Sequence, residues 1–576
     1  MLGAGTRSAV ALAVLGVSVL LPRAVRAQFD EAPPPAVYAL SGVTVVQADG
    51  SRQENVTIIV RRGFIEAMGP DVEIPAGAEV LEGDSLMVYP GLIDGHGGAE
   101  IEIPEPEVNR QELEAWDPPR DVQGFTPHRR AVDFLTATGP DLRSERAQGV
   151  VAGAVFPSGP VMPGRGAFAV YRTDAETPRE LVTDADVGLV FTLRGARGAY
   201  PGTLFGVKAF HRQALENARH QGTVAAAHQR DPRDVAAPRY DPDYDVLRLA
   251  LGGTAPVYYM ADHSEDVRTA LELAEQYDLR LILVGGQHAW RVAEQLRERR
   301  VPVLVSLDFP DPERWEPEDE AAEAEEVAEP AEAEEAAVPE AAQEPEPLDA
   351  AAEREKRELE TMYRNAGRLA QAGVRIALTS GGGETDLLEG TRTAVECGLD
   401  PAQALQALTT TPAALFGVQY LTRIERGMPA TFIVTDGPLF DEETRIVHLF
   451  VEGGYEEGRA GRAAGGEAPA VDMTGEWDVS INAEGQDMGG TMTLTQEGAE
   501  FSGTMTMELG TVRIRSGIVS GNDITFTLVV SMGGETLEFD VEGTVQGDEA
   551  EGSGSGAMGS FTWSATRTTT PGTEVR

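Results

Sequence analysis

The sequence predicts a multidomain α/β protein built around a (β/α)8 barrel. Its 576 residues exceed what one hydrophobic core normally organises. Between residues 89 and 417, short apolar runs alternate with amphipathic helical segments, which predicts the barrel. Two β-rich stretches flank it, at 36–88 and 418–455, and predict a composite small β-sandwich. Residues 470–570 alternate polar and apolar positions, which predicts a C-terminal antiparallel β-barrel.

The N-terminal residues 1–27 are typical of a secretory signal peptide. Arg7, an apolar run over residues 9–21 and a small-residue site before Gln28 follow one another in the order that such peptides require. The run is too short to span a bilayer, although an uncleaved anchor is the alternative. No later segment is long and apolar enough to be transmembrane. We therefore expect a periplasmic or extracellular protein that begins at Gln28, without a membrane span after cleavage.

The small β-sandwich is expected to combine two distant parts of the chain. Upstream strands are predicted over residues 37–46, 56–61 and 64–68. A matching pair is predicted far downstream, over residues 431–437 and 445–451. Because both pieces are β-rich and enclose the α/β region, they predict one domain built from both of its ends.

The barrel is predicted from apolar strands between amphipathic helices. Helical periodicity is clearest in residues 264–277 and 289–300. Strands that are apolar on both faces are typical of a parallel sheet covered by helices, and this many units favours a closed, TIM-like barrel over an open sheet. Functional side chains would then follow the C-terminal ends of the strands. The candidate strands are residues 150–156, 189–193, 256–260, 280–284, 301–306 and 374–379.

The charge of the chain limits its partners. A formal charge of −47 at pH 7 argues against nucleic acid and against anionic membranes. Residues 316–349 hold fifteen Asp or Glu and no Lys or Arg. They predict a disordered or transiently helical insertion after the strand that ends near Ser306, with a metal-buffering or partner-binding tract as the alternative. The single Cys397 excludes an intramolecular disulfide and is expected to be a packed thiol.

The last hundred residues predict an antiparallel meander with one buried face, since residues 491–495 and 524–528 alternate Thr with apolar side chains. Near its start, Gly475-Glu476-Trp477 resembles the Gly-x-Trp signature of lipocalin-like barrels. That resemblance implies that Arg567, on the last predicted strand, covers Trp477. A small closed barrel is therefore expected.

Residues from about 36 to 455 resemble the amidohydrolase superfamily, in its secreted imidazolonepropionase-like branch. The matching segments are PGLIDGH (90–96), PSGPVMPG (157–164), LQALTTTPA (405–413) and IERGMPA (424–430). The resemblance implies hydrolysis of non-peptide C–N bonds, in cyclic amides or peptide-like amides. It also implies a divalent metal, Zn²⁺ or another, that lowers the pKa of a bound water to about 7.

In that family the metal ligands are two His on strand one, a Lys or Glu on strand four, one His on each of strands five and six, and an Asp after strand eight that is also the general base. This sequence keeps His96 but has Gly98 in place of its partner. Met260, Gly285 and Gly381 stand where the other two His and the Asp are expected. A degenerate site with no catalytic residue and no bound cofactor is therefore predicted.

A rebuilt metal site is the alternative. His263, His288 and Asp262 follow strands five and six and would have to join His96, since a hydrolytic zinc needs at least three protein ligands and an open position. For His263 and His288, an ordinary place at the start of a helix is the competing interpretation. Lys208 lies beside a helix-forming segment (residues 210–220) and not at the end of an apolar strand, so a surface or substrate-loop lysine is expected in place of a metal-bridging carbamate. Carboxylates just beyond Gly381 are Glu384 and Asp386.

Three functions remain open. The first is the family hydrolase. The second is a pseudoenzyme that binds a small-molecule or peptide-like ligand, or that regulates an active homologous amidohydrolase subunit. The third is a secreted protein that binds its ligand through residues 470–570. The missing metal ligands favour the second, and no nucleophile elbow, Walker loop or dinucleotide fingerprint supports another enzyme class.

Overall fold

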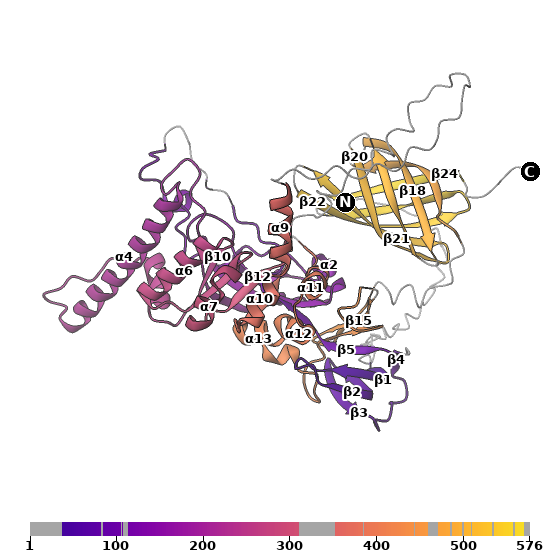
Figure 1. Cartoon of the computed structure of the whole chain (residues 1–576), viewed down its shortest axis with the longest axis horizontal. Helices are drawn as coiled ribbons and strands as arrows, with labels where there is room; N and C mark the ends of the chain where they lie inside the picture. Colours follow the sequence, from indigo (N-terminus) through magenta and orange to yellow (C-terminus); the bar gives the residue numbers. More distant parts are fainter. Residues whose placement is uncertain are drawn as a thin grey trace, which may run out of the picture.

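The computed structural model describes residues 37–81, 85–104, 106, 113–309, 352–383, 385–442, 444–458, 471–483, 486–497, 500–507, 510–532, 535–556 and 559–569 (Figure 1). The predicted signal peptide 1–27, the acidic insertion 316–349 and Glu384 lie outside the described residues. Among the helices that are described, none is long and apolar enough to cross a membrane.

One small sheet domain combines both ends of the α/β region. Its eight strands pair in the order β16-β15-β14-β5-β1-β2-β3, with β4 on β1. The strands are β1 (Val37–Val46), β2 (Arg52–Arg61), β3 (Phe64–Gly69), β4 (Glu79–Leu81), β5 (Met87–Pro90), β14 (Phe432–Thr435), β15 (Ile446–Val451) and β16 (Gly454–Glu457). In place of two separately paired sheets of a sandwich, the hydrogen bonds therefore form one continuous sheet.

Both faces of this sheet are apolar at its centre. Val88 and Phe432 belong to the sheet's own cluster of buried side chains. Their neighbours Tyr89 and Ile433 point the other way and join the core of the barrel. Because successive residues of a strand face opposite sides, β5 and β14 bind the small domain to the barrel. β5 then leads almost directly into the first barrel strand.

The central barrel is built on a second eight-stranded sheet, in the order β13-β12-β11-β10-β9-β8-β7-β6. Its strands are β6 (Leu92–Asp94), β7 (Val150–Val155), β8 (Gly164–Val170), β9 (Val182–Thr192), β10 (Val257–Ala261), β11 (Leu281–Gly285), β12 (Val303–Ser306) and β13 (Ile376–Thr379). The first and last strands meet where the Gly95 N–H donates to the Leu378 carbonyl at 3.1 Å. This contact brings the C-terminal ends of β6 and β13 together.

One strand corrects the expectation of a uniformly parallel barrel. β8 was not predicted, and it runs antiparallel to both β7 and β9. Only residues 156–163 connect β7 to β8, which is too short for the crossover that parallel strands need. Gly164 and Gly166 hid this strand in the sequence, since glycine is depleted in strands.

The helices follow the sequence pattern with one change. The predicted helix 264–277 is α6 (Ser264–Tyr277), whereas the predicted helix 289–300 divides into the 3-10 helix η3 (Ala289–Val292) and α7 (Ala293–Arg299). The others are α1 (Arg120–Gln123), η1 (Ala131–Asp133), η2 (Pro140–Leu142), α2 (Arg143–Ala147), α3 (Pro178–Leu181), α4 (Leu204–Arg230), α5 (Pro242–Leu251), α9 (Ala352–Tyr363), α10 (Asn365–Gln371), α11 (Leu387–Glu396), α12 (Pro401–Leu408), α13 (Thr410–Phe416) and η5 (Gln419–Thr422).

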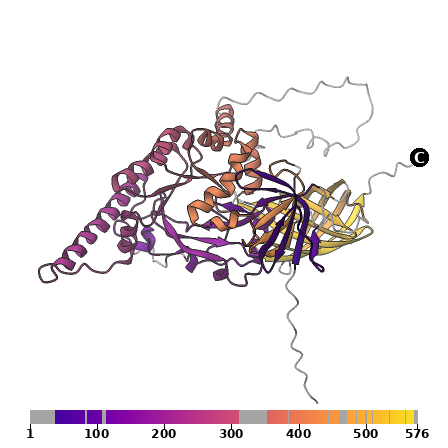
Figure 2. The same ribbon diagram turned by 90° about the horizontal axis from the view of Figure 1, so that it is seen from below.

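The longest helix, α4, projects from the barrel (Figures 1 and 2). Its buried side chains all lie in its N-terminal half, from Val207 to Ala218. α5 packs along it. Lys208 lies within this helix, near its start, and not beside it as the sequence predicted, because α4 begins six residues before the predicted segment 210–220.

The C-terminal unit is a closed antiparallel barrel in which β17 pairs with β24. Trp477 is fully buried and donates from Nε1 to the Met473 carbonyl at 2.9 Å. The Arg567 guanidinium lies 4.3 Å from the centre of the Trp477 ring, so the expected cover of this side chain is present. Its strands are β17 (Gly475–Ala483), β18 (Gln486–Glu497), β19 (Glu500–Met507), β20 (Gly510–Ser520), β21 (Asp523–Met532), β22 (Glu535–Gln546), β23 (Glu549–Gly556) and β24 (Gly559–Thr569).

Candidate functional site at the barrel mouth

A buried carboxylate holds the ends of the first and last barrel strands together. Asp94, the last residue of β6, is fully buried. It accepts hydrogen bonds from Ser380 Oγ at 2.5 Å, from Ser380 N at 3.2 Å and from His96 N at 2.8 Å. Burial raises the pKa of Asp94 to about 6, while the Ser380 and His96 hydrogen bonds oppose that rise. Asp94 is therefore a structural acceptor and not a free base.

His96 is held by its backbone, and the residue is half-buried. The His96 carbonyl accepts from Thr379 Oγ1 and from Gly382 N, each at 2.9 Å. The imidazole packs edge-on against Phe156, with 5.2 Å between ring centres. Burial lowers the pKa of His96 to about 4, so the ring is neutral near pH 7. A neutral imidazole is a competent metal ligand, but a site needs several.

The position of the second strand-one imidazole is occupied by another side chain. A Cβ placed on Gly98 would lie 2.2 Å from Oε1 of Glu145 and 3.0 Å from the Cα of Gly383. Glu145 comes from α2 and is 8% exposed. Burial, and then repulsion from Asp94 and Asp386, raise its pKa to about 8. Glu145 thus carries a proton at neutral pH in the space beside Gly98.

A tyrosine fills the neighbouring space. Cβ atoms on Gly97 and Gly153 would lie 2.2 Å and 2.5 Å from the Tyr171 hydroxyl. This hydroxyl is buried and has no hydrogen-bond partner within the described chain. Desolvation raises the pKa of Tyr171 well above its usual range, and the carboxylates of Glu145 and Asp94 add to that rise. The mouth therefore holds a close-packed group of polar side chains, of which Glu145 and Tyr171 are uncharged at neutral pH.

The backbone after β13 explains the missing aspartate. Gly381, Gly382 and Gly383 have φ angles of +83°, +104° and +86°. Side chains of L-residues rarely adopt such values, so an Asp at 381 would strain this turn. The Gly381 N–H donates to Thr379 Oγ1 at 3.0 Å and the Gly383 N–H donates to Ser380 Oγ at 2.8 Å. The turn is built to support Asp94 through Ser380.

The other candidate ligands gather at the ends of β10 and β11. The rings of His263 and His288 are stacked, with 5.2 Å between centres and planes 27° apart. Oδ1 of Asp262 lies close to Gly285, 2.1 Å from where its Cβ would be. His288 Nε2 is 3.3 Å from Glu358 Oε1, although neither of its buried ring nitrogens makes a hydrogen bond among the described residues. These side chains adjoin one another, and no observed contact links them to His96.

The described side chains do not form a metal centre. No three of their His, Cys, Asp or Glu side chains lie close enough together to hold an ion. Met260, at the expected strand-five position, offers only a thioether, which is a poor ligand for Zn²⁺ or Mn²⁺. The residues present therefore do not fit the metal that the resemblance implies.

Four polar residues at this mouth were missed by the sequence analysis: Asp94, Glu145, Tyr171 and Ser380. Asp94 had a signal, since it is a carboxylate at the end of an apolar strand within the matched segment. Glu145 had none, because it lies in the polar stretch Arg143–Ala147 and only its position in the fold buries it. Four of the remaining histidines have structural contacts, such as His211 Nε2 to the Val161 carbonyl at 3.2 Å; the others are His128, His228 and His448.

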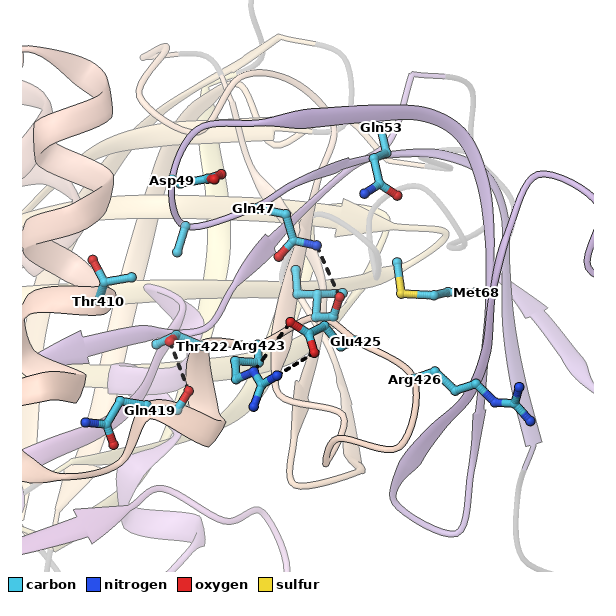
Figure 3. Close-up of a pocket in the computed structure, with 12 residues that line it drawn as sticks. Gln47, Asp49, Gln53, Met68, Thr410, Gln419, Thr422, Arg423, Glu425 and Arg426 are labelled. Atoms are coloured by element: carbon cyan, nitrogen blue, oxygen red, sulfur yellow. Dashed lines mark hydrogen bonds and ion pairs between the residues drawn. The ribbon is translucent and has the colours of Figure 1, made fainter.

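A groove of about 650 Å³ lies away from the mouth, between the small sheet and the segment around η5 (Figure 3). Gln47 Nε2 donates to the Ile424 carbonyl at 3.1 Å, and Arg423 pairs with Glu425 at 2.6 Å. No residue that the sequence analysis proposed as a metal ligand lines this groove.

Comparison with known proteins indicates which family part of the chain resembles. Residues 304–454 match the model of the amidohydrolase family. An amidohydrolase from Thermotoga maritima MSB8 superposes with a TM-score of 0.54 at 21% identity, over 73% of this chain and 99% of its own. Part of the chain is therefore similar to the amidohydrolase family, and the fold is TIM-barrel-like, as predicted. The narrower imidazolonepropionase-like branch stays a prediction.

Among curated proteins the similarity is weak and partial. A dihydroorotase from Geobacter metallireducens is 24% identical over 259 residues, which cover 42% of this chain and 56% of that protein. A dihydroorotase from Geobacter sulfurreducens is 26% identical over 199 residues, covering 33% and 42%. The chain thus spans about half the length of the curated relatives it matches.

Proposed function

We propose that this chain is a non-catalytic member of the amidohydrolase group, which has lost the metal-dependent hydrolysis of C–N bonds. It would act as an exported protein that binds a small-molecule or peptide-like ligand at the barrel rim, or that stabilises or regulates an active homologous amidohydrolase subunit. The observation that carries this proposal is the Glu145 carboxyl in the space beside Gly98. A second imidazole cannot project there while Glu145 remains.

The chemistry of the mouth supports this proposal. Hydrolysis in the family needs a metal to activate water and a carboxylate to take its proton. Asp94 is engaged by three hydrogen bonds from Ser380 and His96. Glu145 is protonated at neutral pH and cannot accept a proton there. His96 offers one neutral imidazole, and the turn at Gly381 has no side chain to serve as base.

A hydrolase with a rebuilt centre is the second candidate, and His288 is the observation that favours it. Both of its ring nitrogens are buried without a hydrogen-bond partner among the described residues, and His263 is stacked on it. Asp262 and Glu358 could supply oxygen ligands after side-chain movement. The third candidate, ligand binding inside the C-terminal barrel, is less well supported, because nineteen buried apolar side chains fill its interior.

The proposal is tested by an activity screen with added metals. The purified protein is assayed for ring opening of dihydroorotate, the reaction of the curated relatives, with Zn²⁺, Mn²⁺ or Co²⁺ added in turn. We expect no turnover above that of a His96→Ala, His288→Ala double variant. Turnover that both metals and these histidines support would establish the hydrolase instead.

A further inference from the structure

Glycines make room at the mouth for two side chains. Glu145 occupies the space that side chains at positions 98 and 383 would need, since its Oε1 would be 2.2 Å and 3.2 Å from the respective Cβ atoms. Tyr171 does the same for positions 97 and 153. All four glycines are found where the ends of β6, β7 and β13 converge. The second half of a His-x-His motif is thus excluded by volume, and not only by the absence of a ligand.

We propose that Glu145 is an internal plug: its carboxyl fills the place beside Gly98, lets the barrel mouth pack without a metal ion, and keeps divalent cations from His96. This inference rests on the proposed loss of hydrolysis and adds the residue responsible. Glu145 is therefore a positioning residue, which acts on its neighbours by occupying space.

Contacts on two sides fix the position of α2, the helix that carries Glu145. Arg146, 3% exposed, pairs with Glu456 on β16 at 2.5 Å and donates to the Gly139 carbonyl at 2.7 Å. Gln148 Oε1 accepts from the Leu387 N–H at 3.0 Å, at the start of α11. These contacts anchor α2 to the small sheet and to α11.

Tyr171 supports the plug from the other side. Its ring is fully buried, and its hydroxyl reaches the space between Gly97 and Gly153. The hydroxyl is packed closely against the backbone of both glycines, which leaves no room for a side chain at either position. Together the two side chains seal the inner wall of the mouth.

A double-mutant cycle tests whether Glu145 occupies this space. Gly98→Ala is made in the wild-type and in the Glu145→Ala background, and the thermal midpoint of the barrel transition is measured. Gly98→Ala should lower the midpoint by several degrees in the wild type, and by less than half as much without Glu145, because only the contact with Gly383 remains. As a control, Gly489→Ala, where a Cβ meets no atom within 4 Å, should have the same effect in both backgrounds. Equal effects of Gly98→Ala in the two backgrounds would overturn the plug.

A second arm tests cation exclusion with Ni²⁺ as the probe. Gly98→His combined with Glu145→Ala should bind Ni²⁺ at least ten-fold more tightly than the wild type or Glu145→Ala alone, because two imidazoles then face one space. A folded double variant with wild-type Ni²⁺ affinity would contradict exclusion by Glu145. If this variant does not fold, the alanine cycle decides. Stoichiometric native metal in the wild type would instead refute the proposed function, whatever the cycle shows.

Discussion

Glu145→Gln should change how the stability of this protein depends on pH. Burial and the repulsion from Asp94 and Asp386 raise the pKa of Glu145 from 4.5 to about 8 in the folded chain. A carboxyl with a raised folded pKa holds its proton more tightly when folded. Its contribution is therefore fully present below pH 4.5 and is lost as the pH rises through 8. Glutamine keeps the shape of the protonated carboxyl and cannot titrate.

The magnitude follows from the size of that shift. At about 1.36 kcal/mol per pKa unit, an increase from 4.5 to about 8 corresponds to at most about 5 kcal/mol of stability. For the barrel and the small sheet domain together, roughly 400 residues with an unfolding entropy of about 2.1 cal/mol/K per residue, this equals a change of about 6 °C in midpoint. Asp94, raised to about 6, and His96, lowered to about 4, also titrate, but in both proteins. The difference between the wild type and the variant isolates Glu145.

Scanning calorimetry from pH 5 to pH 9 provides the assay. Between pH 5 and pH 9 about 4 kcal/mol of this stabilisation is lost, so we expect the midpoint of the wild-type barrel to fall by about 5 °C relative to Glu145→Gln across this range. Glu272→Gln, at an exposed helical position, is the matched control and should follow the wild type. Parallel curves for the wild type and Glu145→Gln would refute the argument that a buried, protonated carboxyl lies at the mouth.

Three other changes test separate parts of the structure. Ser380→Ala should destabilise the barrel by about 2 kcal/mol, because Asp94 loses its shortest hydrogen bond; an unchanged urea midpoint would speak against that contact. Arg567→Ala should destabilise the C-terminal barrel by about 2–3 kcal/mol, through loss of the stacking on Trp477 and of the hydrogen bond to the Thr474 carbonyl, and Arg567→Lys by less. Tryptophan fluorescence during unfolding measures this loss of stability, and equal stability of the wild type and the two Arg567 variants would contradict the prediction. Deleting residues 316–349 should leave the midpoint within about 5 °C, whereas a larger drop would show that the tract packs against the fold.

The sequence allowed much of the fold to be predicted, because periodicity and composition are local signals. The amphipathic pattern of residues 264–277 corresponds to α6, and the apolar runs near 280–284 and 374–379 correspond to β11 and β13. β8 was missed because its glycines are atypical of strands and its antiparallel direction depends on a short connection. Direction and pairing come from the whole chain, which a local pattern does not contain.

The site was predictable only in part, for a related reason. The loss of ligands at Gly98 and Gly381 could be read from the sequence, since the flanking segments match the family. The side chains that fill the space beside these glycines could not be predicted from the sequence. Glu145 reaches it from a separate helix, Tyr171 from the end of β8 and Ser380 from the turn after β13. A side chain that approaches from a distant element leaves no pattern beside the residue it replaces.

The metal content of the purified, mature protein tests the central claim most directly. With one imidazole at the mouth and Glu145 beside it, we expect elemental analysis to find well under one divalent ion per chain, and a chelator to leave the thermal midpoint unchanged. His96→Ala should then alter neither result. A stoichiometric ion that is lost in His96→Ala would contradict this account, and would mean that side chains such as Asp262, His263 or His288 had rebuilt a hydrolytic centre.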